Sequence, residues 1–96
     1  LLHNAASPHL RCLIEASSVR RTMKPRDHRA ARACIDRVLE LDRNFHPAWS
    51  QLALLSLEEY ALGLNPQPGP PLDRALGAAL NAVRLAPSSA RGQQVM

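Results

Sequence analysis

Few residues of this 96-residue chain have the types and spacing that catalysis or metal binding would need. Histidines occur at positions 3, 9, 28 and 46, but none has a second His, a Cys or an acid at a metal-ligand spacing within a known motif. Glu58 and Glu59 are adjacent, and neighbouring residues on a helix point about 100° apart, so their carboxylates would not converge on a substrate. We therefore expect a solvated helix face at this pair, no enzyme activity, and no catalytic, metal-binding or cofactor-binding residues.

The two cysteines, Cys12 and Cys34, form neither a metal-binding pair nor a disulfide framework. Free cysteine is among the most buried residue types, so two apolar core thiols are the simpler interpretation. A disulfide is the alternative, because two neighbouring antiparallel helices could bring the two side chains together.

Basic side chains gather in the first part of the chain. The formal net charge is +4, and residues 1–37 carry eight basic and three acidic side chains. The densest group lies within residues 20–32 and consists of Arg20, Arg21, Lys24, Arg26, Arg29 and Arg32. A basic nucleic-acid-binding element is one interpretation, but the group contains no Phe, Tyr or Trp on which bases could stack. A solvated helix face or an acidic protein partner needs no such aromatic side chains, so both are favoured over nucleic acid.

Proline, capping residues and apolar spacing divide the chain into helices. Ser7 and Pro8 suit a capped helix start, Pro25 suits a second start, and Gly63 suits a helix end. The pattern predicts helices at about 8–21, 26–42, 47–62, 71–86 and 89–96, with an extended, polyproline-like loop at 64–71. No segment alternates apolar and polar residues as a strand would. The sequence thus predicts an all-α fold, with residues 1–96 forming one helical domain cut from a longer protein.

Apolar residues at three- and four-residue spacing indicate which side of each helix is buried. The expected core consists of Ile35, Val38, Trp49, Leu52, Ala53, Ala75, Ala79 and Val83. The same stripes contain Leu10, Leu13 and Ile14 in the first helix, Leu57 and Tyr60 in the third, and Leu72, Leu76, Ala82 and Ala86 in the fourth.

The chain also contains an internal period. A shift of 44 residues places Ala31 on Ala75 and Val38 on Ala82. The spacing resembles the tetratricopeptide repeat family. The first-helix signature is matched by Trp49, Leu52 and Ala53, and the second-helix signature by Ala75, Ala79, Ala82 and Pro87. The sequence departs from the pattern at Arg43, where a closing Pro is usual, at Ser56, where an aromatic is usual, and in a period longer than the family's, which is about 34 residues.

This resemblance implies an α-α superhelix, a solenoid of stacked antiparallel helix pairs, that serves as a protein- or peptide-binding scaffold. The chain is also similar to the repeat regions of bacterial adenylate cyclases and winged-helix transcription regulators, which implies a sensory or interaction segment of a larger bacterial regulatory protein in the cytoplasm. In the family the first helix of each pair lines the binding groove. The groove candidates are therefore Arg11, Glu15, Ser50, Gln51, Leu54 and Glu58.

Two further expectations concern surfaces. No apolar run is long enough to span a membrane, so we expect no membrane contact within this chain. A helical array that ends without a polar capping helix leaves its last apolar stripe uncovered, so self-association at that end is expected.

Overall fold

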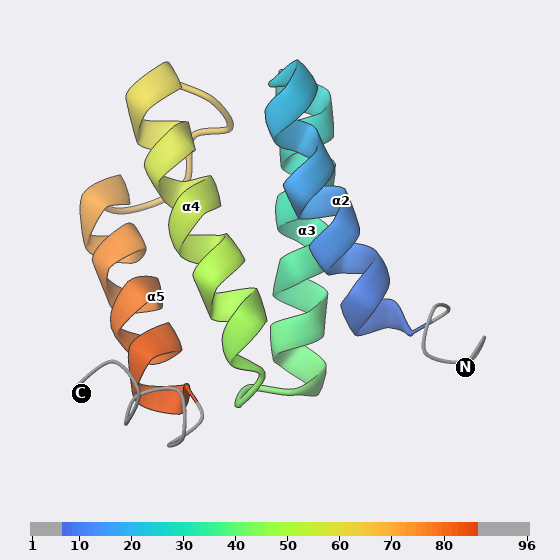
Figure 1. Cartoon of the computed structure of the whole chain (residues 1–96). Helices are drawn as coiled ribbons and strands as arrows, with labels where there is room; N and C mark the ends of the chain where they lie inside the picture. Colours follow the sequence, from blue (N-terminus) through green and yellow to red (C-terminus); the bar gives the residue numbers. More distant parts are fainter. Residues whose placement is uncertain (1–6, 87–96) are drawn as a thin grey trace, which may run out of the picture.

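The computed structural model describes residues 7–86 of the chain. Within that range the protein has four helices and no strand, which confirms the all-α prediction. The helices are α2 (Pro8–Thr22), α3 (Pro25–Leu41), α4 (His46–Leu62) and α5 (Pro71–Leu85). Successive helices run antiparallel to one another (Figure 1). The helix expected at 89–96 lies outside the described residues.

Proline stands in the first turn of each of the described helices. Pro8, Pro25 and Pro71 are first residues, and Pro47 is the second residue of α4. A first-turn proline has its φ angle preset for the helix and lacks an N–H that the helix would leave unpaired. The side chain of Ser7 makes no capping hydrogen bond, so the prediction that Ser7 caps this helix is wrong. Pro8 alone marks the start of α2.

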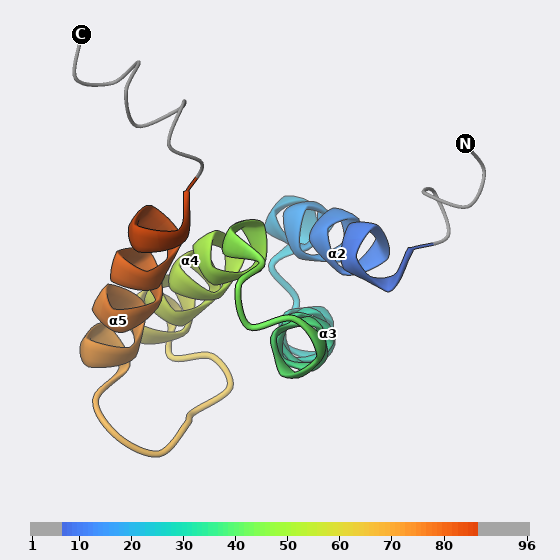
Figure 2. The same ribbon diagram turned by 90° about the horizontal axis from the view of Figure 1, so that it is seen from below.

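The helix α4 is central and contacts α2, α3 and α5. An end-on view shows α2 and α4 side by side, α3 next to both of them, and α5 on the far side of α4 (Figure 2). The helices α2 and α5 are therefore the two edges of the array. The stacking of antiparallel helix pairs into a solenoid stays a prediction.

The core lies where α2, α3 and α4 meet. Its buried members are Cys12, Ala16, Val19, Ala31, Cys34, Ile35, Val38, Leu39, Ala48 and Leu55. Ile35 and Val38 were expected there, and Trp49 and Leu52 pack against the core while partly exposed. Trp49 also donates a hydrogen bond from Nε1 to the carbonyl of Arg43, 2.8 Å away, so it anchors the turn between α3 and α4.

The edge helix α5 faces α4 with small residues, which contradicts part of the predicted core. Ala78 and Ala82 are buried, whereas Val83 is 62% exposed. Leu72 and Leu76, which the predicted stripe also placed inside, are exposed as well. Alanine lets two helix backbones approach closely, so the alanine side of α5 packs against α4 and turns the bulkier side away.

In α2 and α4, too, some residues that were predicted to be buried are exposed. Ala16 and Val19 of α2 are buried, and Leu10 and Ile14, expected in the packed stripe, are exposed. Leu57 and Tyr60 of α4 are also exposed. The remaining predicted core residues, which are Ala53, Ala75 and Ala79, are half-buried.

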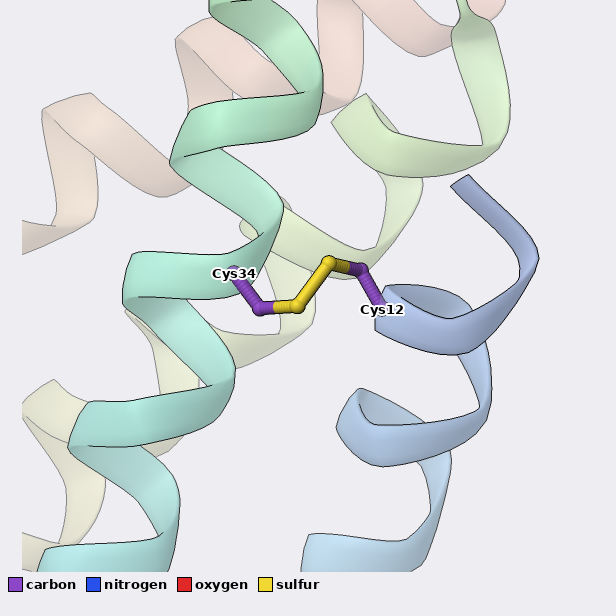
Figure 3. Close-up of a disulfide and its surroundings, with 2 residues drawn as sticks. All are labelled: Cys12 and Cys34. Atoms are coloured by element: carbon purple, nitrogen blue, oxygen red, sulfur yellow. A yellow bond between two sulfur atoms is a disulfide. The ribbon is translucent and has the colours of Figure 1, made fainter. Parts of the chain in front are cut away.

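A disulfide between Cys12 and Cys34 joins α2 to α3 (Figure 3). The two Cα atoms are 5.3 Å apart, within the usual range for a disulfide, and both side chains are buried. The interpretation as two free thiols is therefore wrong, and the alternative holds. Antiparallel packing of α2 on α3 places the two residues opposite each other.

The Pro-rich connection between α4 and α5 is held by side chains of both helices. Arg74 donates from Nη1 to the carbonyls of Pro68 and Gly69, at 2.6 and 2.8 Å. Gly69 has a φ of +83° and Asn65 a φ of +46°. A polyproline helix has negative φ at every residue, so none runs unbroken through Asn65 and Gly69, and residues 64–70 form a loop without helix or strand, as the sequence predicts.

Loss of the Cys12–Cys34 disulfide should destabilise the protein. The bond closes a loop across 22 residues, for which restriction of the unfolded chain contributes about 3 kcal/mol. We expect Cys12→Ala/Cys34→Ala to lower the free energy of unfolding by about that amount in urea denaturation. Dithiothreitol should lower the stability of the parent chain similarly and leave that of the double variant unchanged. Equal stability of the reduced and oxidised parent chain would contradict this prediction.

Candidate partner-binding surface

A cluster of charged side chains joins α2, α3 and α4 beside the core. Arg20 of α2 places Nε 2.8 Å from Oε2 of Glu58 and donates from Nη1 to Oε1 of Gln51 at 3.0 Å. His28 of α3 is fully buried and places Nε2 3.2 Å from Oε1 of Glu58. Glu58 of α4 is therefore contacted from two other helices, and the position of α2 along α4 is set by polar contacts.

The second half of the cluster is more deeply buried. Arg32 of α3 donates from Nη1 to Oε1 of Glu59, whose side chain is 2% exposed. Asn65 of the Pro-rich loop donates to Oε2 of Glu59 at 3.1 Å. A buried carboxylate requires such partners, because it has lost its hydration. The expectation of a solvated face at the glutamate pair is therefore wrong for Glu59.

Arg32 also faces the outer edge of the cluster. Its Nε lies 3.6 Å from Oδ2 of Asp36, one turn further along α3. Partial desolvation raises the pKa of Asp36 above its ordinary value, and the neighbouring guanidinium of Arg32 opposes that rise. The side chain of Asp36 is half exposed, so this pair adds little to the buried contact with Glu59.

One face of the array carries exposed apolar side chains from α2 and α4. Cys12 and Glu59 contact α3, so they lie on the sides of α2 and α4 that face it. A residue two positions away lies about 200° around the helix, so it points almost directly away from α3. The exposed stripes on those opposite sides define what we call the α2–α4 face. It consists of Leu10, Ile14, Ser17 and Arg21 of α2, and of Ser50, Leu54, Leu57 and Ala61 of α4.

The four groove candidates on α4 lie on or beside this face. Ser50 and Leu54 are exposed within it, and Leu54 is 45% exposed. Gln51 and Glu58 lie along its border with α2, where both contact Arg20. These two side chains are thus committed to the contact between helices, which helical spacing alone did not indicate.

The two groove candidates on α2 lie elsewhere. Arg11 and Glu15 are exposed, but Glu15 lines a shallow cavity of about 430 Å³ between α2 and α3. Thr22, Asp27 and Ala30 line the same cavity, on the flank of α2 that does not meet α4. The structure therefore does not bring Arg11 and Glu15 together with the candidates on α4. The residues that accompany Leu54 are instead the exposed Leu10, Ile14 and Leu57, which sequence reasoning had assigned to packed stripes.

Within residues 7–86, no group of three or more His, Cys, Asp or Glu side chains is arranged to hold a metal ion. No helix in the same range is long and apolar enough to cross a membrane.

Breaking the buried ion pair from one side should be costly. We expect Arg32→Met to lower the free energy of unfolding by about 3 kcal/mol, because it leaves Glu59 buried without its cation. Arg29→Met, at an exposed position on the same helix, should change it by less than about 0.5 kcal/mol. Urea denaturation followed by circular dichroism measures both.

The double variant Arg32→Met/Glu59→Leu supplies the matching test. It removes both charges, so it should recover at least half of the stability lost in Arg32→Met. Equal stabilities of the Arg32→Met and Arg29→Met variants would show that the pair does not hold α3 to α4.

Comparison with known proteins assigns no family to this arrangement. The chain matches no family model, and no curated protein or solved structure is significantly similar to it. The resemblance to tetratricopeptide repeats therefore rests on the sequence positions named above, and the structure adds to it the all-helical architecture.

Proposed function

We propose that the chain is a helical scaffold that binds another protein through the α2–α4 face. The observation that carries this proposal is the exposure of four large apolar side chains on that one face, namely Leu10, Ile14, Leu54 and Leu57. Large apolar side chains gathered on one exposed surface commonly mark an interaction site.

The interior supports this use of the surface. The disulfide holds α2 on α3, and Arg20 holds α2 on α4 through Glu58 and Gln51. A binding surface whose two halves are already fixed loses little conformational entropy when a partner docks. The buried contacts thus favour a preformed face that does not require rearrangement.

The partner that fits this face best is an amphipathic helix from another protein. Two exposed helical stripes side by side offer apolar contact along their length, which suits a helix with apolar anchors at three- and four-residue spacing. Arg21 lies exposed within the face, so an acidic side chain beside the anchors would be favoured. The resemblance to tetratricopeptide repeats supports the same class of function, a protein-binding segment of a larger regulatory protein.

The disulfide bears on the compartment in which the protein works. A cytoplasmic protein would be kept reduced, whereas disulfides such as Cys12–Cys34 persist in oxidising compartments. The disulfide therefore favours an oxidising environment over the cytoplasm expected from the resemblance.

Nucleic-acid binding by residues 20–32 is the second candidate function. The structure places two of its six basic side chains, Arg20 and Arg32, in ion pairs with Glu58 and Glu59. The other four, which are Arg21, Lys24, Arg26 and Arg29, are exposed. Affinity for nucleic acid would fall steeply with added salt, whereas an apolar face would lose little, so a salt titration distinguishes the two functions.

The binding proposal predicts a specific loss at Leu54. Peptides selected from a random phage-displayed library against the folded chain should carry apolar residues at helical spacing. Leu54→Asp should weaken binding of a selected peptide by about tenfold or more in a fluorescence anisotropy titration, because it places a charge at the centre of the apolar contact.

Leu41→Asp is the matched control, since Leu41 is also exposed but ends α3, outside the α2–α4 face. It should leave the affinity unchanged. Failure to select any peptide, or equal affinities of the two variants in their folded state, would contradict the proposal.

A further inference from the structure

The outer side of α5 carries a second apolar surface, separate from the α2–α4 face. Leu72, Leu76, Leu80 and Val83 are 47%, 60%, 60% and 62% exposed. They follow one another at spacings of four, four and three residues, so they form one ridge along the helix. We call them the α5 ridge. Because Ala78 and Ala82 pack the other side of α5 against α4, the ridge lies on the side of α5 away from α4, and α5 is an edge helix among the described residues (Figure 2).

Two opposite charges flank the α5 ridge. Asp73 and Arg84 are exposed and each follows an end member of the ridge by one residue, which places both on the same flank. Arg84 also donates to the side chain of Asn81 at 3.1 Å. Arg74, the other charged residue of α5, is turned to the Pro-rich loop, where it binds the carbonyls of Pro68 and Gly69.

The ridge and its charges are arranged symmetrically about the middle of α5. Leu72 and Val83 lie at similar distances on either side of Ala78, as do Leu76 and Leu80. Asp73 and Arg84 also lie at similar distances on either side of Ala78, and their charges have opposite signs. A surface of this kind is complementary to itself when a second copy is turned end for end.

We propose that a second copy of this chain docks on the α5 ridge, with the two α5 helices antiparallel about a two-fold axis near Ala78. Leu72 then packs on the partner's Val83, and Leu76 packs on the partner's Leu80. Asp73 meets the partner's Arg84, and the two-fold axis forms this ion pair twice. A parallel arrangement would bring the two Asp73 carboxylates to the same end and lose both pairs.

The proposed dimer leaves the α2–α4 face free, because the two surfaces belong to different helices. A dimer would thus present two copies of the partner-binding face, and either proposal can fail without the other. The ridge is small compared with the interfaces of permanent dimers, so a weak, concentration-dependent dimer is expected.

Sedimentation equilibrium of the full 96-residue chain over a concentration series tests the proposal. The parent chain should show a closed monomer–dimer equilibrium. Leu76→Asp should shift it to monomer, because a carboxylate would be buried in the contact. Leu41→Asp, with an exposed leucine at the end of α3, should dimerise like the parent chain.

A charge exchange tests the antiparallel geometry. Asp73→Arg and Arg84→Asp should each weaken dimerisation by about tenfold, since each creates two pairs of like charges across the interface. Combining them should restore the dissociation constant to within about threefold of the parent value. Thermal unfolding of each variant separates a loss of association from a loss of helix stability.

The proposal is overturned by a parent chain that stays monomeric at every concentration, or by one that forms open-ended oligomers. It is also overturned if Leu41→Asp disrupts association as strongly as Leu76→Asp. Failure of the combined charge exchange to restore association would rule out the antiparallel pairing.

Discussion

The ion pair between Arg32 and Glu59 is the contact on which the arrangement of the helices depends. Removing both charges from water costs free energy, and only closely placed partners offset that cost. Asn65 satisfies the second oxygen of Glu59, and His28 places Nδ1 3.9 Å from it. These partners come from α3 and from the Pro-rich loop, so one carboxylate of α4 fixes the position of both. If α3 slid along α4 by one turn, Arg32 would move away from Glu59 and leave this buried carboxylate without its cation.

The division between small buried residues and large exposed ones explains the shape of the array. At its edges, α2 and α5 pack through residues such as Ala16 and Ala78, which allow close approach of the backbones. Their bulkier residues, such as Ile14 and Leu80, therefore face outward. An isolated domain would gain stability by burying this apolar area, which instead stays in contact with water. This arrangement is consistent with helices that pack against further protein on both sides of the array.

Local features of the fold were predictable, and long-range pairings were not. Proline at residues 8, 25 and 71 and glycine at 63 set helix ends by backbone geometry alone, which a sequence displays directly. Ile35 was placed correctly because α3 is amphipathic in the ordinary way. Val83 was misplaced because the apolar stripe of α5 is wide, and the choice between its alanine side and its leucine side depends on α4.

In the candidate site, too, the exposure of single residues was predictable, whereas contacts between residues distant in the sequence were not. Leu54 was predicted to be exposed because it lies opposite the packed stripe, and it is. The role of Glu58 was missed because its partners, Arg20 and His28, lie about 30 residues or more away in sequence and on two other helices. The disulfide was left open for a similar reason, since only the packing of α2 on α3 brings Cys12 to Cys34.

The Pro-rich connection between α4 and α5 reduces the conformational entropy that the chain loses on folding. Prolines at 66, 68 and 70 already restrict φ before folding, so ordering this segment removes less conformational freedom than ordering a glycine- or serine-rich linker would. Arg74 then holds the segment through two backbone carbonyls, and Glu59 holds it through Asn65. The connection thus acts as a stiff spacer that needs no core of its own, and it delivers α5 to α4 at little entropic cost.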